Sequence, residues 1–428
     1  MADKGLFAGF AIISILQVNS TSPEIWGLFA VLIGLNSAIL TISDSVALVN
    51  ILQFGINEDN APKVNLFALT THTILLMLLP LLLFFMKDWI AMGFSNPDDI
   101  IAVLTFLPIF NLSCLLRYFC LKFVYKYSEM KKLFFINLMY FLPITLITLY
   151  GKYYLKIEFD FLDFVYMYMA GNILSSIVAL AMTYKKIKLG KQGDISIKQM
   201  MDFSIPLLFT QFLHAMPKQL DSLIILFFFD KKVNGIYSTA KTFFRVFEET
   251  LSAAQGLLYP AFIRRINKND ITTLKELVSK SISFLFVTFL GILIAVQLGA
   301  VDFIFVHFID SKFIDASRMF TILSLASIFL PFLILTALLN AELKTKLLLK
   351  YVLYSVVSYL SAMVIIGYIG NPMLIPLGYI IYTSVLGLLG LSYYKKTYDY
   401  QYKEIFTSLL DAKNYISSLK KKKKSIIN

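Results

Sequence analysis

The sequence has few of the residues on which metal sites, disulfide frameworks and soluble domains depend. Among its 428 residues there are two cysteines and three histidines, and only 15% of the residues are charged. Cys114 and Cys120 fall in one apolar stretch, which argues against a disulfide framework and against a cysteine-based metal site. The histidines, His72, His214 and His307, are too dispersed to bind a metal together, so no metal ion is expected.

Sequence motifs of nucleotide binding and hydrolysis are also missing. The chain has no GxxxxGK[ST] loop, no HExxH, no CxxC and no dinucleotide fingerprint. We therefore expect no cofactor, no enzymatic activity and no ATP hydrolysis within this chain.

Apolar residues, in contrast, are abundant. They make up 58% of the chain, its mean hydropathy is +0.73, and soluble domains contain about 45–50%. A bilayer core about 30 Å thick is crossed by roughly 20 helical residues. This composition predicts an all-α integral membrane protein with twelve transmembrane helices. The predicted spans are 5–22, 26–54, 66–86, 99–121, 133–151, 161–183, 203–229, 234–263, 281–308, 315–340, 347–369 and 373–394.

Basic residues alternate between the gaps that separate these spans. If the N-terminus is cytoplasmic, seventeen lysines and arginines lie in the inner gaps and six in the outer gaps. This bias predicts a multi-pass topology with both termini in the cytoplasm. The net charge of +12 is then explained by topology and by contact with anionic membrane lipids, and it does not indicate nucleic-acid binding.

The longest inner linker divides the chain into two halves of six spans each. Two halves that both enter from the cytoplasm are related by a pseudo-twofold axis along the membrane normal. We predict an N-terminal six-helix bundle (1–183), a cytoplasmic linker (184–200), a C-terminal six-helix bundle (201–397) and a basic cytoplasmic tail (398–428).

A weak internal repeat supports this division. The segment EIWGLFA (24–30) opens the second span and KVNGIYS (232–238) opens the eighth. Gly27 and Gly235 therefore occupy the same place in the two halves, where an outer turn becomes a helix and a permissive backbone is useful. The match indicates a duplicated architecture.

Polar residues inside the spans are costly, because a charge at mid-membrane costs about 2.5–3.5 kcal/mol on insertion scales. They recur at helical spacing in the seventh and eighth spans, which places each set on one face of its helix. The second span adds one charge, Asp44. The seventh-span set is Gln211, His214, Lys218 and Asp221, and the eighth-span set is Tyr237, Lys241, Arg245, Glu248, Ser252 and Gln255.

Two interpretations of these faces remain open. They line a wet cavity between the halves, or their charges pair within the helices, Lys218 with Asp221 and Lys241 or Arg245 with Glu248 or Glu249. Arg117 in the fourth span either faces the cavity or extends to the inner surface.

The segment 221–245, DSLIILFFFDKKVNGIYSTAKTFFR, resembles a signature of the polysaccharide transporter family, the O-antigen flippases. In this signature an Asp opens an apolar run, a polar turn follows, and Gly-Ile-Tyr-Ser comes next with an Ala nearby. Here these positions are Asp221, Gly235, Ile236, Tyr237, Ser238 and Ala240. PEIWGLF (23–29) and 258–269 resemble further family segments.

Membership of this family would imply a fold like that of the MATE exporters of the MOP superfamily. It would also imply a bacterial inner membrane and a substrate of undecaprenyl pyrophosphate carrying an oligosaccharide. Lys218, Lys241 and Arg245 would then bind the pyrophosphate, because a dehydrated anion needs fixed positive charge. Tyr237, Gln211 and Gln255 would contact sugars. An H⁺ or Na⁺ gradient and a downstream polymerase are further expected partners, and the candidate ion-coupling residues are Asp44, Asp221, Glu248 and His214.

Two other functions compete with this one. A MATE-type drug or cation antiporter of the same fold would use the buried acids as cation sites. A membrane polymerase or ligase of lipid-linked sugars would need a large outer loop, and no outer gap in this sequence exceeds about fifteen residues.

Overall fold

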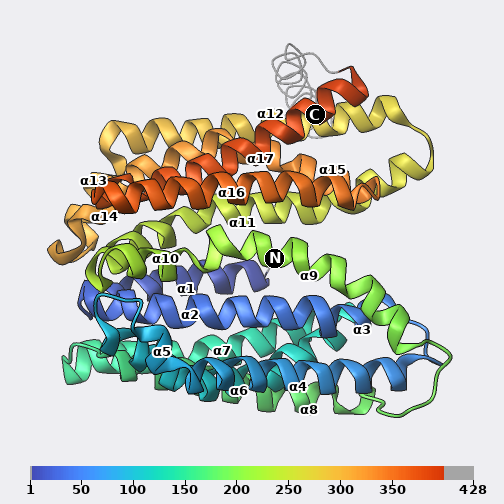
Figure 1. Ribbon diagram of the computed structural model, residues 1–428, viewed down its shortest axis with the longest axis horizontal. Coiled ribbons are helices and arrows are strands. Elements are labelled where there is room, and N and C mark those ends of the chain that lie inside the picture. Colours follow the sequence, from blue (N-terminus) through green and yellow to red (C-terminus); the bar gives the residue numbers. More distant parts are fainter. Residues whose placement is uncertain (1, 400–428) are drawn as a thin grey trace, which may run out of the picture. The chain divides into compact units, whose positions relative to one another are not determined.

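The structure is a computed structural model that describes residues 2–399. Every regular element within this range is a helix, and this range contains no β-strand. The predicted basic tail lies outside the described residues from position 400 onward. The chain divides into two compact units (Figure 1), Met1–Thr239 with Phe308–Ile314, and Ala240–His307 with the residues from Asp315 onward.

The first unit contains ten complete α-helices and the start of an eleventh. Within it α6, α7 and α8 pack against one another, and α2 packs against α4, α6 and α9. Its helices are α1 (Ala2–Val18), α2 (Pro23–Ser43), α3 (Val49–Gln53), α4 (Ala61–Phe85), α5 (Lys87–Ala91), α6 (Pro97–Lys126), α7 (Met130–Leu149), α8 (Phe161–Thr183), α9 (Ile197–Gln219), α10 (Asp221–Phe228) and the first turns of α11 (Lys231–Asn267), with the π-helices η1 (Asp44–Leu48) and η2 (Tyr150–Leu155) and the 3₁₀ turns η3 (Tyr184–Lys186) and η5 (Ser311–Phe313).

The second unit contains the rest of α11 and the helices that follow it. Within it, the helices α16 and α17 run side by side. The elements are α12 (Ile271–Ala295), η4 (Val296–Ala300), α13 (Val301–Phe308), α14 (Ile314–Leu323), η6 (Ser324–Ile328), η7 (Leu330–Leu333), α15 (Ile334–Ala341), α16 (Thr345–Ile369), η8 (Pro372–Leu374) and α17 (Ile375–Tyr398).

Each of the twelve predicted spans overlaps helical structure, but the number of spans is not confirmed. Among the described residues, eight helices are long and apolar enough to cross a membrane, or nine if a pair bent by 52° forms one span. The protein is a multi-pass membrane protein. α1, with 17 residues, and the polar α9 and α11 do not meet this criterion, so their crossing stays a prediction.

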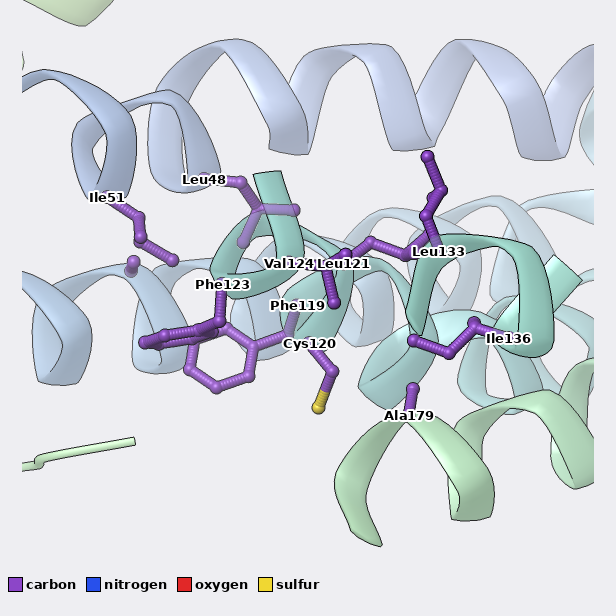
Figure 2. Close-up of a cluster of buried hydrophobic side chains, with 11 residues drawn as sticks. Leu48, Ile51, Phe119, Cys120, Leu121, Phe123, Val124, Leu133, Ile136 and Ala179 are labelled. Atoms are coloured by element: carbon purple, nitrogen blue, oxygen red, sulfur yellow. The ribbon is translucent and has the colours of Figure 1, made fainter. Parts of the chain in front are cut away.

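The interior of the first unit is built from apolar side chains on several helices. Figure 2 shows one cluster, in which Phe119 and Phe123 of α6 lie among residues from neighbouring elements. Leu48 and Ile51 come from the end of the second predicted span, Leu133 and Ile136 from α7, and Ala179 from α8. Burial of these side chains packs one face of α6 against its neighbours. The residues on its other faces are left for polar contacts.

Gly27 and Gly235, which the sequence paired by position, meet in the structure where α2 crosses the start of α11. A Cβ on Gly27 would lie 1.9 Å from the carbonyl oxygen of Lys231, and one on Gly235 would lie 1.8 Å from that of Pro23. The side-chain amide of Asn234 donates a hydrogen bond to the Gly27 carbonyl at 2.7 Å. Only glycine permits this approach of the two backbones, as at small-residue contacts between membrane helices.

Backbone conformation gives independent support for a duplicated architecture. Ser128 (φ 54°) lies two residues before α7, and Leu343 (φ 59°) lies two residues before α16. Lys156 (φ 54°) directly follows η2, and Gly370 (φ 71°) directly follows α16. Left-handed conformations are uncommon outside glycine, so their recurrence at matching places indicates the same loop geometry in both halves.

The predicted linker is bound to the start of α4 and is not a free spacer. Asn60 accepts a hydrogen bond from the backbone N–H of Asp194 at 3.0 Å. The Lys63 ammonium donates to the Gly193 carbonyl at 3.1 Å, and the Asn65 amide donates to the Lys188 carbonyl at 2.9 Å. The linker is therefore held to the N-terminal helices by contacts along its length.

The glycine contact leads to a stability prediction. Gly235→Ala should force α2 and α11 apart, and overpacking of this kind typically costs about 1–3 kcal/mol. Gly256→Ala is the matched control on the same helix, because a Cβ there meets nothing within 4 Å. We expect a lower unfolding temperature for purified Gly235→Ala, and none of this loss for Gly256→Ala. Equal unfolding temperatures for the two variants would contradict the contact.

Candidate functional site

The first unit contains a polar cavity of about 570 Å³. Three stretches of chain supply its walls: the end of α2 with η1 and α3, the last turns of α6, and α9. The lining residues are Ser37, Leu40, Thr41, Asp44, Ser45, Val49, Tyr118, Leu121, Lys122, Tyr125, Leu207, Gln211 and Gln219.

An ion pair lies in this cavity. The Lys122 ammonium is 2.6 Å from a carboxylate oxygen of Asp44, and the side chains of Lys122 and Asp44 are 16% and 44% exposed. Asp44 begins the π-helix η1. In a π-helix the backbone hydrogen bonds join residues five apart instead of four, and such turns are frequent at functional sites. The widened turn interrupts the regular helical spacing at the point where the carboxylate meets Lys122.

Lys122 was not among the predicted site residues, because the fourth span was expected to end at residue 121. In the structure α6 continues to Lys126, so Lys122 is a helical residue one turn after Tyr118. The sequence carried a signal for this: KFVYK (122–126) contains no glycine or proline that would end a helix.

The predicted polar face of the seventh span is divided in the structure. Gln211 lines the cavity, and Lys218 is exposed near the end of α9. The helix stops at Gln219, and Asp221 begins the separate helix α10, where it is 2% exposed and accepts a hydrogen bond from the Ser222 N–H at 2.9 Å. The predicted set is thus divided between two helices that meet at Leu220, a break that the sequence did not predict.

Arg117 follows neither of its two predicted placements. It is 8% exposed, and its guanidinium donates to Ser175 on α8 and to Asn137 on α7, both at 3.0 Å. The ring of Tyr140 lies 4.2 Å from its guanidinium carbon. Arg117 is thus a buried cation between α6, α7 and α8, stabilised by neutral hydrogen-bond acceptors and an aromatic face.

On α11, the predicted polar set spans about 80° of the helix surface at 3.6 residues per turn, and its two edges differ. At one edge Tyr379 donates a hydrogen bond to the Glu248 carboxylate, and the Gln255 amide donates to the Leu333 carbonyl at 2.8 Å. Tyr237 is buried, with 2% exposure. Glu248 and Gln255 therefore hold α11 to α17 and η7 within the second unit.

The other edge of this set carries Arg245, which is exposed. Lys241, one turn earlier, is partly buried. Glu248, the acidic residue three positions after Arg245, is engaged by Tyr379.

His72 has a structural role. One ring nitrogen of His72 is 2.6 Å from the Ser43 hydroxyl, and the other is 3.1 Å from the Leu115 carbonyl. Both nitrogens are engaged between α2, α4 and α6. Among residues 2–399 no group of three or more His, Cys, Asp or Glu side chains is arranged to hold a metal ion.

Comparisons with known proteins identify the family and the fold. Residues 22–309 match the family described as polysaccharide biosynthesis protein. No protein of curated function matches the sequence.

Three solved structures resemble this one over nearly its full length. A multidrug resistance MATE family transporter of the MOP superfamily, in an inward-facing conformation, has a TM-score of 0.73 at 13% identity, and covers 91% of this chain and 93% of its own. The lipid II flippase MurJ, in an inward closed conformation, has a TM-score of 0.69 at 15% identity, with 94% and 88% covered. A variant of the MATE transporter VcmN of Vibrio cholerae has a TM-score of 0.62 at 14% identity, with 93% and 95% covered.

At this level of identity the likeness shows the fold alone, and that fold is the one shared by MATE transporters and MurJ. These structures are of transporters and a flippase, not of enzymes. Because the family match spans more than half of the sequence, the chain belongs to the polysaccharide biosynthesis protein family, and its fold is that of the MATE transporters.

Proposed function

We propose that the protein is a flippase that moves an undecaprenyl-pyrophosphate-linked oligosaccharide across the bacterial inner membrane by alternating access. The observation that carries this proposal is the combination of a polysaccharide biosynthesis family match with an exporter fold. A protein of glycan synthesis with the fold of a transporter is best explained by movement of a glycan precursor.

The cationic residues suit the pyrophosphate of such a substrate. Arg245 is exposed on α11, and an exposed guanidinium can form charge-assisted hydrogen bonds with phosphate. Lys218 and Lys241 are proposed to share this role. Tyr237 is buried, and the Gln255 amide donates to the Leu333 carbonyl. Of the three predicted sugar contacts we therefore retain Gln211.

Alternating access requires closure on one side of the membrane, and the first unit shows contacts suited to this. They join residues at the predicted outer ends of the N-terminal half to segments of the predicted C-terminal half. The Lys231 ammonium lies 2.8 Å from Asp99, and Lys312 pairs with Glu158. The Asn19 amide donates to the Phe308 carbonyl at 2.6 Å and accepts from the Asp310 N–H at 2.9 Å.

We propose that these contacts, called here the outer latch, seal the periplasmic side while the cytoplasmic side is open. The orientation follows from the predicted excess of basic residues in the inner gaps. Opening of the latch would be driven by an H⁺ or Na⁺ gradient or by removal of the product. Asp44, Asp221, Glu248 and His214 remain candidate coupling residues.

The alternative of a drug or cation antiporter differs in its expected phenotype. The MATE fold is shared by both functions, and only the family match favours the polysaccharide precursor. Loss of an antiporter would raise drug sensitivity without changing surface glycans.

Deletion of the gene tests the proposal directly. We expect loss of the surface glycan and accumulation of lipid-linked repeat units on the inner leaflet, because synthesis continues while translocation stops. Surface glycan is measured by gel analysis, and the lipid-linked units by extraction and mass spectrometry. Normal surface glycan together with increased drug sensitivity would replace the flippase by the antiporter.

Arg245→Ala should lower export by about tenfold to a hundredfold, the loss expected for one charge-assisted hydrogen bond of about 1.5–3 kcal/mol. Arg264→Ala removes an exposed charge from the last turn of the same helix and should export normally. Export is compared at matched protein levels. Unchanged export in Arg245→Ala would show that the guanidinium does not contact the substrate.

The outer latch leads to a cross-linking prediction. In a Glu158→Cys/Lys312→Cys double variant, a short disulfide-forming bifunctional reagent should stop export, and reduction should restore it. Cys114 and Cys120 are buried and serve as an unreactive background, and the two single variants are the controls. Full export by the cross-linked protein would show that these loops do not separate during transport.

A further inference from the structure

The cavity of the first unit has a composition unlike that of a phosphate site. Its polar groups are three hydroxyls (Ser37, Thr41, Ser45), two amides (Gln211, Gln219), two phenols (Tyr118, Tyr125) and the Asp44–Lys122 pair. Because the carboxylate and the ammonium are in contact, the lining carries no net charge at neutral pH.

This neutrality decides which ligands the cavity favours. A phosphate approaching Lys122 would have to displace a carboxylate that lies 2.6 Å from the ammonium, and it would meet the charge of Asp44, which is 44% exposed. A sugar hydroxyl can donate to Asp44 and accept from Lys122 while the ion pair stays intact. The pair therefore suits an uncharged, polyhydroxylated ligand better than an anion.

The amides of the cavity have hydrogen-bonding capacity left over. The Gln219 carbonyl oxygen accepts a hydrogen bond from the Thr41 hydroxyl at 3.3 Å, but the Gln219 NH₂ group donates to no residue within the described range. The Gln211 amide, exposed on α9, bonds to no residue that the structure describes. Both amides are available to hydroxyl groups or to water.

Aromatic rings line one wall. Tyr118 and Tyr125 lie seven residues apart on α6, which places them two turns apart on one face of the helix. Such rings combine an apolar face with a polar tip, which matches the apolar faces and polar edges of sugar rings. A cavity of about 570 Å³ also falls within the usual range of about 300–1,000 Å³ for small-ligand sites.

The Asp44–Lys122 end of the cavity lies toward the predicted cytoplasmic ends of α2 and α6, whereas Gln219 is the last residue of α9. Lys122 is in the last turns of α6. Asp44 follows the whole of α2, so it lies about 30 Å along the helix from Pro23 at 1.5 Å per residue. The outer latch residues, in contrast, lie in the predicted outer gaps or within a turn of them. The cavity is thus placed on the side where lipid-linked sugars would be loaded.

We propose that this cavity is a subsite for uncharged sugar residues of the transported glycan, separate from the cations that would hold the pyrophosphate. The inference rests on the proposed function and adds a specificity site to it. Asp44 binds sugar hydroxyls in this scheme, held in place by Lys122, and is not required as a coupling group.

The test compares binding of two probes to protein in lipid nanodiscs. One probe is undecaprenyl pyrophosphate without sugars, and the other is the glycosylated lipid extracted from the deletion strain. Gln211→Ala and Gln219→Ala should each weaken binding of the glycosylated lipid by about tenfold and leave binding of the bare lipid unchanged. Thr210→Ala, the neighbour of Gln211 whose hydroxyl bonds to the Pro206 carbonyl, should change neither.

The outcomes separate the subsite from the proposed function. Arg245→Ala should weaken both probes, because both carry the pyrophosphate. If the glutamine variants weaken both probes equally, or neither, the sugar subsite is wrong even where Arg245→Ala behaves as expected. If wild-type protein binds neither probe, the proposed function fails, and with it the subsite.

Discussion

A polar group inside a membrane protein must be hydrogen-bonded, paired or hydrated, and this constraint separates the roles of the charged residues. Arg117 is bonded to neutral acceptors between three helices, and Glu248 accepts a hydrogen bond from Tyr379. Asp44 and Lys122 neutralise each other at the wall of a cavity. Arg245 is exposed on α11. Of these four arrangements, the last two leave groups that can contact a ligand.

The sequence predicted those features that depend on local pattern. Apolar stretches predicted the helices, and the place of Gly27 and Gly235 in two similar segments predicted a shared backbone role. It could not predict that Lys122 meets Asp44 at the wall of a cavity, or that α9 ends before Asp221. It also could not show which edge of the α11 set is engaged by Tyr379 and Leu333, because those partners lie far along the chain.

The two halves show how a duplicated backbone can carry different chemistry. Left-handed residues recur at matching loops, at Ser128 and Leu343 and at Lys156 and Gly370. The polar side chains do not follow this repeat. The ion pair of the first unit is formed by Asp44 and Lys122, whereas the partner of Glu248 in the second unit is a tyrosine. Loop geometry and the paths of the helices can therefore be retained while each half acquires its own polar groups.

A neutral cavity that binds sugars, separate from the cations that bind the pyrophosphate, would suit a transporter better than one strongly charged site. A substrate that is moved must bind well enough to enter and weakly enough to leave. Hydrogen bonds of about 0.5–1.5 kcal/mol each, spread over hydroxyls and amides, can select a glycan without trapping it. Each further cation that binds the pyrophosphate would slow its release. The Asp44–Lys122 pair keeps one lysine from adding to that positive charge, and it thereby favours release.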